Sequence, residues 1–109
     1  RSAARAVSFG LPPTRKALDA YLEMIEGTDL PWAIAVLGGD SCEGELAPYA
    51  LERGGHLRVG LEDFGGPEQP GNVELVERAA ALAKAAGRPL ATFAQARDML
   101  DLRPVALAA

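Results

Sequence analysis

The sequence has little of several features that mark common classes of protein. Cys42 is the only cysteine, so no disulfide can form within the chain, and His56 is the only histidine. No apolar run approaches the roughly 18 residues that a membrane helix needs. No charged segment is followed by the hydrophobic stretch of a secretory signal. We therefore expect a cytoplasmic protein that has no membrane partner.

An excess of positive charge is also missing. The chain has 15 acidic and 11 basic residues among 109, a net charge of −4. This balance argues against a nucleic-acid partner, because a nucleic-acid surface is usually basic. No glycine-rich phosphate loop of either standard spacing occurs. What is present is an ordinary globular composition, with 49% hydrophobic residues.

Short apolar segments alternate with amphipathic ones along the chain. Residues 32–37 form a continuous apolar run between Pro31 and Gly38, which is typical of a strand buried on both faces. Pro48 is tolerated only in the first turn of a helix, so a helix is expected to begin near Ala47. The pattern predicts strands at 6–9, 32–37 and 56–62, helices at 14–25, 47–53 and 72–86, and a capping box at Thr92–Gln95 that opens a last short helix.

Strands that alternate with helices predict an α/β fold with a parallel sheet. Three parallel strands alone would leave two exposed edges. A closed (β/α)₈ barrel needs roughly 250 residues. We therefore interpret residues 1–109 as the C-terminal three β/α units of a TIM barrel, with a tail at 101–109, and expect both ends to belong to a longer chain. The alternative is a small non-catalytic α/β module that binds a partner or assembles through its sheet edges.

The segment 56–62 alternates strictly between two kinds of side chain. Leu57, Val59 and Leu61 are expected to face the helices. Arg58 and Glu62 would then point into the barrel, and Asp63 would follow at the C-terminal end of the strand, where barrel active sites lie. Charged groups in such a place are costly unless they pair with each other, a ligand or a metal. The residues alone leave both an active site and a structural ion pair open.

Three other features have competing interpretations. The backbone N–H groups of Gly38 and Gly39 could bind a phosphate or carboxylate, although a plain turn explains a glycine pair equally well. Cys42 has no histidine near it in the sequence, which favours an inert thiol. His56 stands at the start of its strand, away from the catalytic end of a barrel, which favours a structural role. The helix after residue 71 is expected to bury a stripe of Val73, Val76, Ala80, Ala83 and their neighbours.

Two strings in this sequence resemble the closing part of the β-keto acid cleavage enzymes, typified by 3-keto-5-aminohexanoate cleavage protein. The first is Leu30-Pro-Trp-Ala-Ile-Ala-Val-Leu-Gly38, and the second is Gly54-Gly-His-Leu-Arg-Val-Gly-Leu-Glu-Asp63. Segments 71–77 and 87–92 continue the likeness in order. The resemblance implies a barrel enzyme, a transferase that converts a β-keto acid and acetyl-CoA to acetoacetate and a new acyl-CoA.

The resemblance also implies roles for particular residues. Glu62 matches a zinc ligand whose two histidine partners form a His-x-His motif that this chain lacks. Asp63 matches the catalytic base, and Arg58 matches the arginine that assists it. Independently of the resemblance, the backbone N–H groups of Gly38 and Gly39 are the candidates for an anion or CoA contact. We expect zinc as cofactor, a homo-oligomer of the full-length protein, and no activity or tight zinc binding by the 109 residues alone.

Overall fold

The computed structural model describes residues 10–103. The strand predicted at 6–9 and the end of the predicted tail lie outside this range. Helices and strands alternate through the middle of the chain, as predicted. Their order is α1 (Arg15–Met24), β1 (Ala33–Ile34), α2 (Leu46–Glu52), β2 (His56–Leu57), α3 (Asn72–Ala85) and α4 (Phe93–Met99).

Helix boundaries follow local capping chemistry. Thr14 precedes α1, and its side chain accepts a hydrogen bond from the backbone N–H of Ala17. Thr92 and Gln95 form the predicted capping box at the start of α4. Pro48 is the third residue of α2, inside the first turn, where its missing N–H costs no helical hydrogen bond. Gly87 follows the C-cap residue of α3, Ala86. Its φ is +75°, a conformation that glycine adopts without strain.

The sheet is parallel, as the alternation of elements predicted. Ala33 of β1 pairs with His56 of β2, and Ile34 pairs with Leu57. The ladder continues through the N–H of Arg58, which donates to the carbonyl of Ile34 at 2.9 Å. Both strands are nevertheless shorter than the predicted 32–37 and 56–62. Beyond Arg58 the chain leaves the ladder and enters a turn at residues 61–63.

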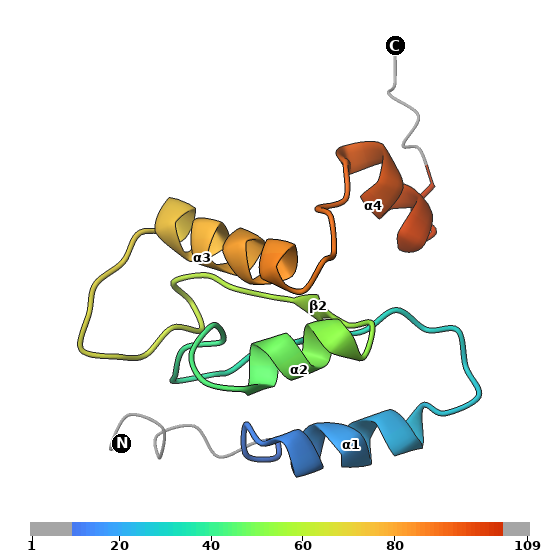
Figure 1. Ribbon diagram of the computed structural model, residues 1–109, viewed down its shortest axis with the longest axis horizontal. Helices are drawn as coiled ribbons and strands as arrows, with labels where there is room; N and C mark the ends of the chain where they lie inside the picture. The colour runs from blue at the N-terminus through green and yellow to red at the C-terminus, as the bar shows by residue number, and fades with distance from the viewer. Residues whose placement is uncertain (1–9, 104–109) are drawn as a thin grey trace.

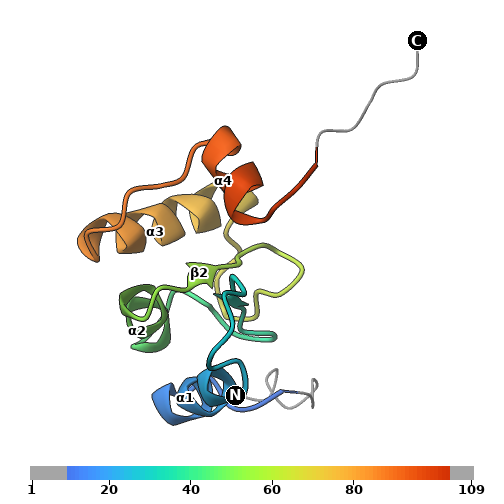
Figure 2. The same cartoon turned by 90° about the vertical axis from the view of Figure 1, so that its right-hand side faces the viewer.

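Helix α2 packs against one face of this sheet, and α1 and α3 lie on the two sides of α2 (Figures 1 and 2). The core lies under α2 and consists of Leu18, Ile34, Leu46, Ala47 and Ala50. Ala33 and Ala35 alternate with Ile34 and are exposed on the opposite face. The prediction that residues 32–37 are buried on both faces is therefore wrong for the described part of the chain, where helices cover one face.

The buried stripe of α3 agrees with the prediction at Ala83 and differs from it at Val73 and Val76. Leu75 is 1% exposed and Ala83 is 8% exposed, and both face the interior. Val73 and Val76 are 74% and 57% exposed. At about 100° per residue, Val73 lies nearly opposite Leu75, so a helix that buries Leu75 exposes Val73. The apolar pattern of this helix allowed either orientation, and packing against α2 selected one.

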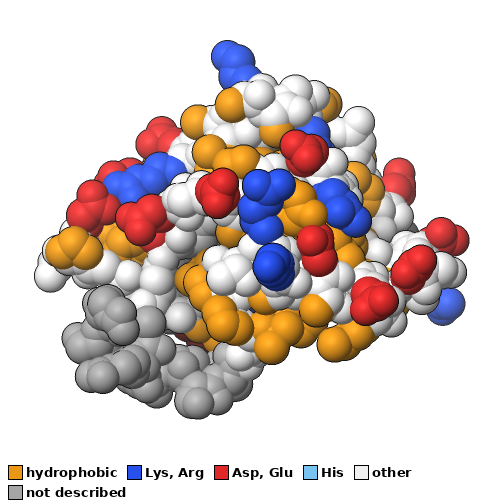
Figure 3. All heavy atoms as spheres, turned by 60° about the horizontal axis from the view of Figure 1, so that its bottom comes forward, with side chains coloured by type: hydrophobic (Ala, Val, Ile, Leu, Met, Phe, Trp, Pro, Cys, Tyr) orange, Lys and Arg blue, Asp and Glu red, His pale blue; other side chains and the backbone are white. Residues whose placement is uncertain are grey.

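Apolar side chains are exposed on α4 and in a groove beside α1. Helix α4 has no buried residue, and Phe93 is 80% exposed. An apolar groove of about 840 Å³ runs between α1 and β1. Figure 3, seen from the α1 side, shows hydrophobic side chains reaching the surface between acidic and basic ones. None of the described helices is both long and apolar enough to cross a membrane.

Candidate active site

The loops that follow β1 and β2 are joined by backbone hydrogen bonds. The N–H of Gly38 donates to the carbonyl of Asp63 at 2.8 Å, and the N–H of Gly65 donates to the carbonyl of Gly39 at 2.7 Å. Gly39 and Phe64 form a parallel bridge. A Cβ on Gly65 would lie 2.6 Å from the carbonyl oxygen of Gly38, so only glycine permits this approach. The C-terminal ends of the two strands are thus fixed to each other.

Arg58, Glu62 and Asp63 converge beside this junction, as predicted. The Nε of Arg58 lies 3.0 Å from Oδ2 of Asp63, and its Nη2 lies 3.4 Å from Oδ1 of the same carboxylate. The same Nη2 donates to Oε1 of Glu62 at 3.1 Å. One guanidinium therefore holds one carboxylate with two nitrogens and the neighbouring carboxylate with one.

The two acidic side chains have opposite environments. The side chain of Asp63 is 5% exposed, and that of Glu62 is 87% exposed. Strict strand alternation predicted that Arg58 and Glu62 would share the inner face of a strand running to residue 62. Instead the turn at 61–63 brings Glu62 back to Arg58 and directs Asp63 inward. The same turn leaves Leu61 51% exposed, so the prediction that Leu61 faces the helices is wrong.

The turn itself is anchored by α3. Oδ1 of Asn72, the first residue of α3, accepts a hydrogen bond from the N–H of Leu61 at 2.8 Å. The N–H groups of Asp63 and Phe64 both donate to the carbonyl of Gly60. No local signal in the sequence connects Asn72 with a turn eleven residues earlier.

A second arginine connects the same loops to α3. Arg78 lies 3.5 Å from Asp40 in the loop after β1, 3.4 Å from Glu68 in the loop after β2, and 2.6 Å from Glu74 one turn before it. The hydrogen bond with Glu74 raises the pKa of Arg78, so the guanidinium remains charged. The pair with Glu74 could be foreseen from the i, i+4 spacing, but the contact with Asp40 could not.

The remaining candidates are His56, Cys42 and Gly38. His56 belongs to the ladder, where its N–H donates to the carbonyl of Trp32 at 3.0 Å. Burial, and then the negative charge of Asp40, raise the pKa of the Cys42 thiol, which disfavours the reactive thiolate. The N–H of Gly38 is taken by Asp63, so it does not point at a ligand.

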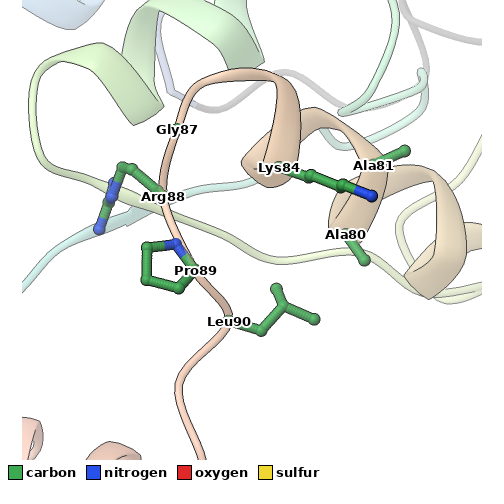
Figure 4. A pocket seen from close by; sticks show the side chains of 7 residues that line it. All are labelled: Ala80, Ala81, Lys84, Gly87, Arg88, Pro89 and Leu90. Atoms are coloured by element: carbon green, nitrogen blue, oxygen red, sulfur yellow. The ribbon is translucent and has the colours of Figure 1, made fainter.

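A further groove, of about 550 Å³, lies between the end of α3 and residues 87–90 (Figure 4). Its wall is mostly apolar. Arg88, which lines it, directs its guanidinium to the backbone carbonyls of Leu51 and Gly55 at the end of α2. Arg88 therefore caps a helix and offers this groove no free charge for a ligand.

Known proteins resemble this chain over nearly its whole length. Residues 3–102 match the family model of the beta-keto acid cleavage enzyme. The chain belongs to the beta-keto acid cleavage enzyme family. This confirms the resemblance inferred from the two strings around Trp32 and Arg58.

Three curated relatives of the family illustrate the match. The 3-oxoadipate:acetyl-CoA acetyltransferase of Cupriavidus necator is 39% identical over 102 residues, which cover 88% of this chain and 35% of that protein. The 3-keto-5-aminohexanoate cleavage enzymes of Fusobacterium nucleatum and Acetoanaerobium sticklandii are 41% and 44% identical over 76 and 61 residues. Those matches cover 66% and 52% of this chain and 27% and 22% of the two enzymes. The chain thus spans about a third or less of the length of these relatives.

The described residues test how far this part of a family member could hold zinc. Residues 10–103 contain no group of three histidine, cysteine, aspartate or glutamate side chains that could together bind a metal. A catalytic zinc site normally has three protein ligands. The exposed carboxylate of Glu62 suits one ligand position, because its second oxygen is open to approach from outside. Residues 10–103 therefore fit as one part of a zinc site and not as the whole site.

Proposed function

We propose that this chain is the part of a zinc-dependent beta-keto acid cleavage enzyme that carries the base, its arginine partner and one metal ligand. In the proposed reaction a β-keto acid and acetyl-CoA give acetoacetate and a new acyl-CoA. The observation that supports it best is the Arg58 guanidinium, which contacts a buried carboxylate at 3.0 Å and an exposed one at 3.1 Å within a family match of residues 3–102.

Asp63 is proposed as the base. It would remove a proton from a carbon next to the keto group, which requires an ionised carboxylate held in one direction. Nε and Nη2 of Arg58 approach its two oxygens, and the Gly38 N–H holds its backbone carbonyl. Arg58 would act by orienting Asp63, since a planar guanidinium fixes a carboxylate in direction as well as in charge.

Glu62 is proposed as a zinc ligand, with histidine ligands outside this chain. Bound zinc would supply a Lewis acid that polarises the keto oxygen of the substrate. Gly39 is the member of the glycine pair proposed to contact the anionic part of CoA, because the N–H of Gly38 is already hydrogen-bonded. The whole protein is proposed to be a (β/α)₈ barrel, a homo-oligomer and cytoplasmic.

One observation favours a second role for the same residues. Asp63 is 5% exposed, and the cavity beside it, between the two loops, has a volume of about 10 Å³. No β-keto acid fits there. In this alternative Arg58 and Asp63 form a structural ion pair that shapes the turn, and the chain is a non-catalytic α/β module.

The test is a turnover assay on the complete protein. It is mixed with acetyl-CoA and either 3-oxoadipate or 3-keto-5-aminohexanoate, and the release of acetoacetate is measured. Formation of acetoacetate that depends on both substrates and stops when zinc is chelated supports the proposal. Absence of turnover with a panel of β-keto acids, in a folded protein loaded with zinc, favours the structural alternative. A chain of residues 1–109 assayed in parallel is expected to be inactive and to bind zinc weakly or not at all.

A further inference from the structure

The turn that carries Glu62 and Asp63 is held from two directions. On one side, the N–H of Leu61 donates to Oδ1 of Asn72 at 2.8 Å. On the other side, the carbonyl of Asp63 accepts from the N–H of Gly38 at 2.8 Å. Glu62 lies between these two anchored backbone groups. Its side chain is exposed, but the backbone is held by hydrogen bonds at the residues before and after it.

The two anchors differ in kind. The Gly38 contact is a backbone hydrogen bond between neighbouring loops, and it does not depend on a side chain. The Asn72 contact depends on a single side-chain oxygen on the first residue of a fourteen-residue helix, α3. Helix α3 is fixed in turn by Leu75, which is 1% exposed. Asn72 therefore transmits the position of a packed helix to the turn.

We infer that Asn72 is a positioning residue for the Glu62–Asp63 pair, acting through the N–H of Leu61. Its Oδ1 contacts the backbone of the turn, at the residue before Glu62. Without its oxygen the N–H of Leu61 loses its partner, and the turn keeps only its internal hydrogen bonds to the carbonyl of Gly60 and its backbone contacts with the loop after β1. The hydrogen bonds from the Arg58 guanidinium to Asp63 and Glu62 would then weaken, because both carboxylates belong to residues of this turn. This inference rests on the proposed function for its effect on turnover.

The chain offers a matched control. Oε1 of Gln95 accepts a hydrogen bond from the N–H of Thr92, also at 2.8 Å. Both contacts join a side-chain amide oxygen to a backbone N–H. Gln95 lies in α4, which has no buried residue and carries none of the candidate site residues. Gln95→Ala thus removes the same kind of hydrogen bond from a place where no effect on the pair is expected.

The experiment compares Asn72→Ala, Asn72→Asp and Gln95→Ala in the complete protein. Asn72→Asp keeps an acceptor oxygen at the same reach and should rescue most of the loss. A misplacement of a catalytic group by about 1 Å can cost up to a hundredfold in rate. We expect Asn72→Ala to lower kcat about tenfold or more, with KM nearly unchanged, and Gln95→Ala to leave kcat within about twofold.

A second measurement does not depend on activity. The Nε–H of Arg58 is followed by nuclear magnetic resonance as a reporter of its contact with Asp63. Asn72→Ala should speed its exchange with solvent, and Asn72→Asp and Gln95→Ala should not. If the wild-type protein shows no turnover but the Nε–H responds in this way, the proposed function fails and the positioning role stands. If Asn72→Ala changes neither kcat nor the Nε–H exchange beyond the Gln95→Ala values, or if Asn72→Asp rescues nothing, the positioning role is overturned.

Discussion

The turn at residues 61–63 and helix α4 are built with the same kind of hydrogen bond but differ in how far it reaches. In α4, Gln95 binds Thr92, three residues before it. In the turn, Asn72 binds Leu61, eleven residues before it. The turn is further joined to the loop after β1 through Gly38, whereas α4 buries no side chain. A local hydrogen bond shapes one helix end, and a longer-range one ties a helix to a candidate active site.

The first prediction concerns Asp63, whose side chain is 5% exposed. Asp63→Asn in the complete protein should lower acetyl-CoA-dependent turnover by about a hundredfold or more, because an amide cannot accept the proton. Retention of near-normal turnover by a folded Asp63→Asn protein would exclude the base assignment. The ion-pair alternative would then explain the buried carboxylate.

The second prediction concerns the contacts of the Arg58 guanidinium with Asp63 and Glu62. Arg58→Lys keeps the charge but cannot place two nitrogens on one carboxylate while a third contact reaches Glu62. Turnover should fall by about tenfold, since orienting contacts of this kind affect the rate through geometry. His56→Gln, two residues earlier in the chain, is the control, and it should leave turnover largely intact. Equal losses in the two variants would mean that this segment as a whole, and not the guanidinium, is sensitive.

The third prediction applies the same test to α4. Thr92→Ala removes the cap of this helix and should lower the free energy of unfolding by up to about 1 kcal/mol. Turnover should not change, because α4 carries no site residue. Chemical denaturation and the turnover assay measure the two effects side by side. A large loss of turnover here would show that α4 contributes to the site.

The smallest expected effect concerns Cys42. Its pKa is raised by burial, so at neutral pH the folded protein holds less thiolate than an unfolded chain. Alkylation by iodoacetamide should be slower in the folded protein than in urea at the same pH. The folded state also retains this proton to higher pH than the unfolded state does. The corresponding stability is complete below the pKa of the unfolded thiol and is lost as pH rises through the higher pKa of the folded thiol. Alkylation as fast in the folded protein as in urea would contradict the burial.

The part of this molecule that sequence reasoning predicted is the part set by local chemistry. Thr14 and the Thr92–Gln95 box gave two helix starts, and the alternation of elements gave a parallel pairing of the strands at 32–37 and 56–62. The convergence of Arg58, Glu62 and Asp63 was also predicted. The reason was only partly right, because a turn and not a continuous strand brings Glu62 to Arg58.

The features that were missed depend on contacts between distant segments. Nothing near Asn72 in the sequence indicates that it binds Leu61, and nothing near Arg78 indicates Asp40. Helix α3 has apolar residues on more than one face, so the choice of Leu75 over Val76 for burial was made by packing. The lengths of the two strands were overestimated, because an apolar or alternating run can continue into the loop that follows a strand.

Adjacent residues on one turn are proposed to have separate roles, with Glu62 as metal ligand and Asp63 as base. The most direct measurement is the zinc content of purified Glu62→Gln and Asp63→Asn proteins beside their turnover. Glu62→Gln should lose most of its zinc, because a neutral amide is a poorer ligand than a carboxylate, while its fold is kept since the side chain is 87% exposed. Asp63→Asn should retain zinc and lose turnover. Full zinc content in Glu62→Gln would contradict the assignment.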